Sequence, residues 1–144
     1  MRILKPILIL VMAMMSILQV KAQCFQMSDL VGKTWVATSG YNGCENIDWS
    51  MKISKGSSEH KFIVKENKQS SMFTYNTYLS TTIPQKYDAS LVGKNENGKY
   101  LVFERNYTYN NKLYEDFYYA EIISLVANKL TLRVKNLTIV FVGK

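Results

Sequence analysis

The chain is poor in the residues that most often build catalytic and metal sites. Its 144 residues include one histidine, His60, and two cysteines, Cys24 and Cys44. A nucleophile–histidine–acid triad would have to be built on His60, whose charged neighbours Glu59 and Lys61 predict an exposed strand start. Zinc sites need several nitrogen or sulfur ligands, and a phosphate loop needs clustered glycines; the sequence offers neither. We therefore expect no enzyme activity, no metal and no other cofactor.

The chain also lacks an apolar run long enough to span a bilayer. The run from Ile7 to Val20 is shorter than the ~20 apolar residues that a membrane span needs. It follows the basic residues Arg2 and Lys5 and ends at small residues placed for cleavage before Gln23. This pattern predicts a signal peptide over residues 1–22 and a periplasmic or secreted protein without stable membrane insertion after cleavage.

Two alternatives to a cleaved signal remain open. One is a transmembrane anchor. The other is a lipid anchor on Cys24, although Lys21 and Gln23 stand where lipoprotein signals usually have an apolar and a small residue.

Removal of residues 1–22 leaves 122 residues, enough for one domain over residues 23–144. The remaining 15 basic and 11 acidic residues give a net charge of +4. Because disulfides persist outside the cytosol, the two cysteines predict a Cys24–Cys44 disulfide, with two unpaired thiols as the alternative.

From Gly32 onward, alternating apolar and polar residues between turn residues predict an all-β domain. The expected architecture is a single antiparallel up-and-down β-barrel of about eight to nine short strands, or else a tight sandwich. The expected strands are Lys33–Ser39, Asp48–Lys55, His60–Glu66, Ser71–Ser80, Tyr87–Val92, Lys99–Tyr109, Leu113–Ser124, Lys129–Lys135 and Leu137–Val142.

The strands between Asp48 and Ser80 concentrate large apolar side chains on one face. If the barrel keeps an open cavity, this face would line a site for a small apolar or amphipathic ligand; the alternative is that bulky side chains fill the interior. The predicted ligand-binding residues are Trp49, Met51, Ile53, Phe62, Phe73, Tyr75 and Leu79.

The segment Leu30-Val-Gly-Lys-Thr-Trp35 resembles the N-terminal signature of lipocalins and of small exported lipocalin-like domains of Gram-negative bacteria. Its Gly32-x-x-Trp35 spacing is one residue longer than the usual Gly-x-Trp. The resemblance implies that Trp35 is a structural plug at the closed end of the barrel and that Arg133 lies across it. Arg133 is otherwise a solvated strand charge.

A tyrosine-rich predicted hairpin leaves a second kind of function open. Its tyrosines either pack across the strands or form a surface for carbohydrate or protein, whereas an exported protein meets little nucleic acid. The leading hypothesis is a non-enzymatic binding module for a small ligand. The alternative is a protein-interaction module, such as a hydrolase inhibitor or a surface-assembly component, acting through its loops or this hairpin. The tyrosines are Tyr100, Tyr107, Tyr109, Tyr114, Tyr118 and Tyr119.

Overall fold

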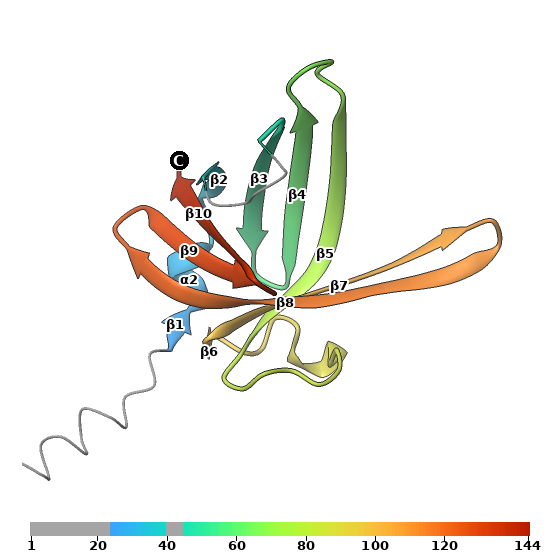
Figure 1. The fold of residues 1–144 in the computed structure, drawn as a ribbon. Coiled ribbons are helices and arrows are strands. Elements are labelled where there is room, and N and C mark those ends of the chain that lie inside the picture. Colours follow the sequence, from blue (N-terminus) through green and yellow to red (C-terminus); the bar gives the residue numbers. More distant parts are fainter. Residues whose placement is uncertain (1–23, 40–44) are drawn as a thin grey trace, which may run out of the picture.

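The computed structural model describes residues 24–39 and 45–144, and its main feature is a closed barrel of eight antiparallel strands (Figure 1). Each strand pairs with the next along the chain, and the last pairs with the first, which is the up-and-down arrangement expected from the alternation. The barrel strands are β2 (Thr34–Ser39), β3 (Ile47–Ser54), β4 (Ser57–Val64), β5 (Ser70–Ser80), β7 (Tyr100–Tyr109), β8 (Lys112–Val126), β9 (Lys129–Val134) and β10 (Leu137–Gly143).

One predicted strand, Tyr87–Val92, is wrong. This segment holds a 3-10 turn, η1 (Ala89–Leu91), because the carboxylate of Asp88 accepts hydrogen bonds from the backbone N–H and the hydroxyl of Ser90 at 3.0 and 2.6 Å. Asp and Ser side chains compete in this way with strand pairing, and a count of alternating residues does not register it.

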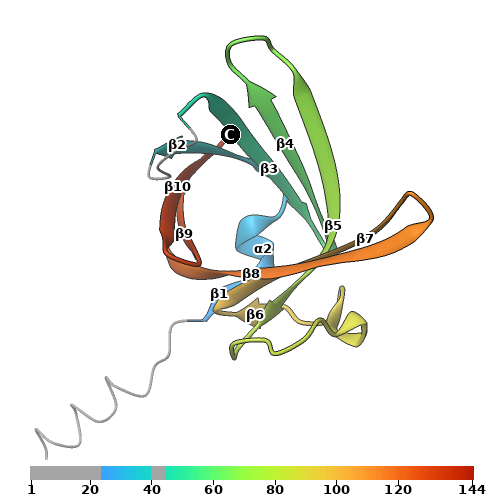
Figure 2. The ribbon, with the colours of Figure 1, turned by 45° about the vertical axis from the view of Figure 1, so that its right-hand side comes forward.

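The N-terminal segment closes one end of the barrel. A short strand, β1 (Phe25–Gln26), pairs with β6 (Asn97–Gly98), and the single-turn helix α2 (Met27–Leu30) follows it. Figure 2 shows α2 within the outline of the strand ring. Met27 and Leu30 are buried in the hydrophobic core, so the helix forms the floor of the barrel.

Trp35 lies fully buried above this floor. Its indole N–H donates to the carbonyl oxygen of Leu30 at 2.9 Å, which ties the first barrel strand to the helix. The cation over its ring is Lys33, whose Nζ lies 5.5 Å from the ring centroid. Arg133, the residue implied by the family resemblance, is 51% exposed in its side chain and pairs with Glu121, so it occupies the alternative position of a solvated strand charge.

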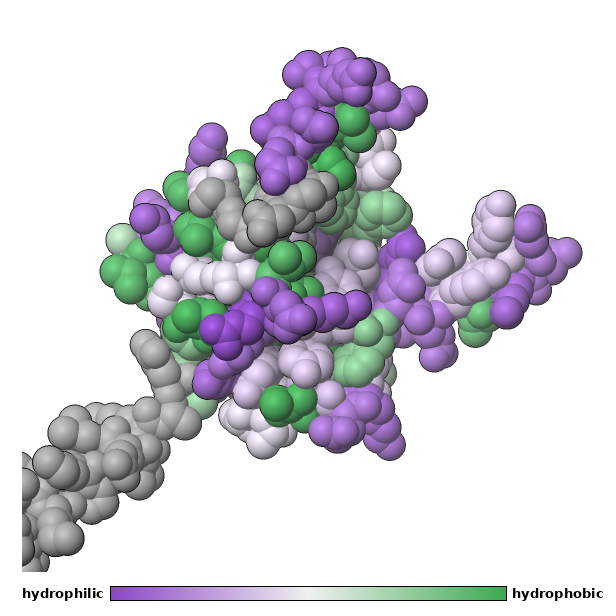
Figure 3. Space-filling model, viewed as in Figure 1, coloured by the Kyte–Doolittle hydropathy of each residue, from purple (hydrophilic) through white to green (hydrophobic). Residues whose placement is uncertain are grey.

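Away from the floor, two hairpins diverge, and we call this side of the barrel its open, flared end. β5 pairs with β7 only from Asn76 to Ser80, so the first half of β5 and the second half of β7 separate. The β4–β5 and β7–β8 hairpins consequently project in different directions in Figure 1 and stand out as separate projections in Figure 3. The β7–β8 hairpin reverses at Asn110 and Asn111, which both have positive φ, 50° and 60°, as a two-residue hairpin turn requires.

The predicted signal peptide and the predicted Cys24–Cys44 disulfide both involve residues outside the described ranges. The predicted signal peptide and Cys44 lie outside the described residues, and Cys24 is exposed with no disulfide to any described residue. Within residues 24–39 and 45–144, no helix has the length and apolar character of a membrane span.

Candidate functional site

The seven predicted ligand-binding residues lie on the inner face of β3, β4 and β5, at two depths. Met51, Ile53 and Leu79 are fully buried in the core near the floor. The remaining four lie farther from the floor: Tyr75 is buried, and three aromatic side chains are half-buried. Those three are Trp49, Phe62 and Phe73. The sequence therefore identified one wall of the barrel, of which only the outer part is partly exposed to solvent.

Aromatic rings fill the barrel where these two sets meet. The ring of His60 lies 4.8 Å from Tyr75 and 5.0 Å from Phe103, measured between centroids, and 5.8 Å from Trp49. The Phe103 ring in turn stacks on Tyr118 at 4.8 Å. Centroid distances of this size are direct ring contacts. A ligand that enters from the flared end would therefore rest on these rings and would not reach the floor.

The exposed position predicted for His60 is wrong, because its side chain is fully buried. His60 shares its strand parity with Ser58 and Phe62 and pairs across the sheet with Met51, so the alternation of β4 turns it inward. The charged neighbours Glu59 and Lys61 point outward on either side of it. The charges of Glu59 and Lys61 therefore indicate the exposure of these two residues and not that of His60 between them.

Inside the barrel, His60 belongs to a short chain of hydrogen bonds. Its Nε2 lies 3.1 Å from the hydroxyl oxygen of Ser58, which lies 2.8 Å from the hydroxyl oxygen of Thr77. Burial lowers the pKa of His60 from 6.5 to about 3, so the imidazole is neutral at neutral pH. Its Nδ1 has no hydrogen-bond partner among the described residues. The distance between Ser58 and His60 is in the range expected for a nucleophile and its general base. However, Ser58 is 1% exposed, so no substrate reaches its hydroxyl.

The opposite wall of the open end is formed by the β7–β8 hairpin, which the sequence analysis did not place in the site. Arg105 and Asp116 pair across the two strands, and the Nη2 of Arg105 donates to Asp116 Oδ2 at 3.1 Å. The guanidinium lies 4.4 Å from the ring centroid of Phe73 and equally far from that of Tyr107. Its Nε is buried and has no acceptor among the described residues. Parity with Leu101 and Phe103 was the sequence signal that could have placed Arg105 on the inner face.

Two tyrosine hydroxyls lie beside this arginine. The rings of Tyr75 and Tyr118 meet edge to face at 5.5 Å, and burial raises the pKa of both phenols. They therefore stay protonated at neutral pH and keep the ability to donate hydrogen bonds. We call the following residues the mouth cluster: Trp49, Phe62, Phe73, Tyr75, Arg105 and Tyr118.

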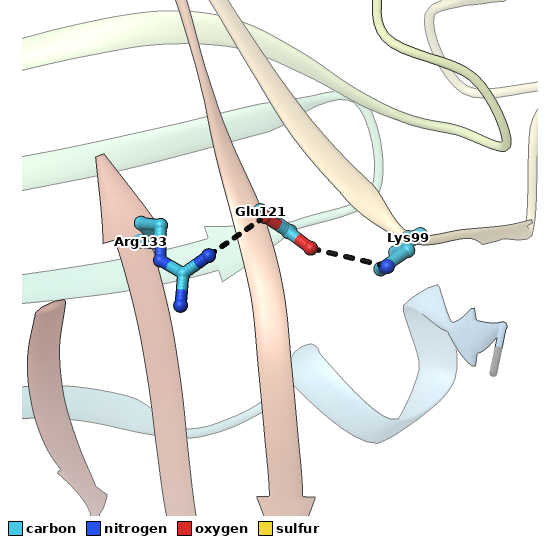
Figure 4. Close-up of polar contacts among 3 residues, drawn as sticks. All are labelled: Lys99, Glu121 and Arg133. Carbon is cyan, nitrogen blue, oxygen red and sulfur yellow. Dashed lines mark ion pairs between the residues drawn. The ribbon is translucent and has the colours of Figure 1, made fainter. Parts of the chain in front are cut away.

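A second group of charges lies on the outer face of the barrel (Figure 4). Glu121 on β8 accepts from Lys99 at 3.1 Å and pairs with Arg133 on β9 at 3.7 Å. The bond to Glu121 raises the pKa of Lys99. Two cations share one carboxylate here, so the group keeps a net positive charge.

Within the described ranges, no three His, Cys, Asp or Glu side chains gather in a way that could hold a metal ion. Comparisons of the chain with protein-family models, with curated proteins and with solved structures find no match. The barrel and the chemistry of the mouth cluster are therefore the features that bear on function.

Proposed function

We propose that this protein is an exported, lipocalin-like binding module without enzymatic activity, which holds a small amphipathic ligand at the flared end of its barrel. The observation that carries the proposal is the mouth cluster, in which a guanidinium with an unused buried donor lies among half-buried aromatic rings. Apolar walls with a few convergent polar groups are the usual composition of small-ligand sites.

The cluster favours one orientation of such a ligand. The apolar body would lie on Trp49, Phe62 and Phe73, whose rings contact one another at 5.3 and 6.0 Å. The polar head would accept hydrogen bonds from Arg105 Nε and from one of the two tyrosine hydroxyls, since Tyr75 and Tyr118 also bond to each other. Since Asp116 already balances the charge of Arg105, the head group needs to accept hydrogen bonds more than it needs a full negative charge.

The proposal is tested by titrating the protein with a medium-chain fatty acid and with the alcohol of the same chain length. Trp49 is half-buried in the mouth cluster whereas Trp35 is fully buried at the floor, so a ligand at the mouth changes the emission of Trp49. We expect Arg105→Met to weaken fatty-acid binding about tenfold or more, which corresponds to a lost hydrogen bond to a charged group.

Lys112→Met is the matched control, because Lys112 is a cation on the same hairpin whose Nζ lies over Tyr114, at 5.4 Å from the ring centroid. It should leave both affinities unchanged. Equal losses in the two variants, or no change of Trp49 emission with either probe, would rule out the mouth cluster as a ligand site.

A further inference from the structure

The β7–β8 hairpin leaves one long strand edge without a partner. β8 pairs with β9 only from Glu121 to Val126, while it pairs with β7 along Lys112–Glu121. The edge of β8 that faces away from β7 therefore has no partner strand among the described residues from Lys112 to Ala120. An exposed edge of this length is a template for another strand.

The register of the hairpin identifies the free backbone groups. Tyr109 and Lys112 flank the two-residue turn and form its closing hydrogen-bonded pair, so every second residue of β8 from Lys112 bonds to β7. The alternate residues direct their N–H and C=O groups to the free edge. These residues are Leu113, Glu115, Phe117 and Tyr119.

A groove of about 400 Å³ lies beside this edge, where β8 parts from β9. Phe117 and Tyr119 of β8 line one side, and Arg133 and Lys135 at the end of β9 line the other. The groove is thus mostly aromatic along the strand. Its end nearest the barrel also contains Glu121, but Arg133 and Lys99 share that carboxylate, so this end keeps a net positive charge (Figure 4).

We propose that the free edge of β8 binds an extended peptide segment of another protein by strand addition. The side chains fix the chemistry of that segment. In an antiparallel pairing, the peptide residue opposite Tyr119 lies next to Arg133 and should be acidic, the residue opposite Phe117 should be apolar, and the residue opposite Glu115 should be basic.

Acidic residues of β8 argue against a second copy of this chain paired along the full length of this edge. If two copies paired antiparallel along the whole edge from Leu113 to Tyr119, Asp116 would face Asp116 of the other copy. A shift by one pairing step toward the hairpin tip would set Glu115 opposite Glu115. Like charges directly opposite each other destabilise a strand pair. This proposal uses the outer edge of β8 and does not depend on the mouth cluster.

The test uses the purified protein and a labelled peptide, Glu-Thr-Val-Thr-Lys-Thr-Ile with blocked ends, followed by fluorescence anisotropy. In the proposed register, the first, third, fifth and seventh residues direct their N–H groups to β8, and the others direct theirs to solvent. N-methylation of the third and fifth residues should abolish binding. N-methylation of the fourth and sixth residues, the matched control, should preserve it.

A charge exchange between the protein and the peptide tests the register. Because the changed peptide should restore binding, a loss caused only by misfolding of the protein variant can be told apart. Glu115→Lys should weaken the peptide roughly five- to tenfold, and replacing the peptide lysine by glutamate should restore the affinity. Absence of saturable binding at millimolar peptide would overturn the proposal. So would equal effects of the two N-methylated peptides, or a dimer of the protein in solution that the peptide disrupts.

Discussion

The buried histidine makes the barrel sensitive to acid in a way that can be calculated. His60 titrates near 6.5 in the unfolded chain and at about 3 in the barrel, because the folded site excludes water from the imidazolium. Between these two values the unfolded state binds a proton that the folded state does not bind. The free energy of unfolding therefore falls as the pH drops below 6.5 and levels off near pH 3.

The expected size of this effect follows from the two pKa values. Between pH 7.5 and pH 5, the His60 contribution lowers the free energy of unfolding by about 2 kcal/mol. Urea denaturation at the two pH values measures the loss in the wild type. His60→Gln and His60→Phe remove the titration, so each should lose about 2 kcal/mol less than the wild type over this interval, whatever its stability at pH 7.5.

The only histidine of the chain also gives a direct assay of its protonation. In the folded protein, the imidazole Cε1–H resonance should not titrate between pH 8 and pH 5. A midpoint near 6.5, or an equal loss of stability in wild type and variants, would show that water reaches the ring and would refute this explanation.

Three further predictions concern stability and processing. Trp35→Ala should cost roughly 3–5 kcal/mol in chemical denaturation, the range for a fully buried large aromatic residue, and Trp35→Phe less. Gly98→Ala should cost roughly 1–3 kcal/mol in the same assay, because its Cβ would lie 2.6 Å from the carbonyl oxygen of Ser80. If the predicted signal peptide is cleaved, intact-mass analysis of the protein from its native cells should show an N-terminus at Gln23 and a Cys24–Cys44 disulfide; a lipid on Cys24 or two alkylatable thiols would contradict this.

Strand parity was the sequence signal that carried the most information about this fold. It predicted the barrel and placed Met51, Ile53 and Leu79 in its core, where the structure has them. Parity with Phe62 also favours the inner face for His60, whereas its charged neighbours predicted the exposed position that the structure contradicts. Parity indicates the face on which a side chain lies. The residues immediately before and after it lie on the opposite face, so their charge describes that face.

The other half of the mouth cluster could not be found in this way. Arg105 and Asp116 are charged, and charged residues at inward positions read as surface in a sequence. They can occupy the inner face because β5 and β7 diverge and water reaches this level of the barrel, which is a property of the closed barrel and not of either strand. The cation over Trp35 is Lys33, which lies two residues before it at the start of the same strand. The family resemblance implied a cation from a late strand, Arg133, and so it did not indicate Lys33.

The composition of the β7–β8 hairpin follows from where it leaves the barrel. Where β7 pairs with β5, up to Glu104, and β8 pairs with β9, from Glu121 onward, each strand has neighbours on both sides, and the inner faces carry fully buried apolar residues. Beyond that level β5 and β9 no longer flank them, so water reaches the inner face and an Arg105–Asp116 pair takes the place of aliphatic side chains. The same departure leaves the backbone of β8 unpaired along its outer edge. A ligand site at the mouth and a strand-binding edge therefore have one structural cause, which is that the β7–β8 hairpin extends beyond the strands that flank it in the barrel.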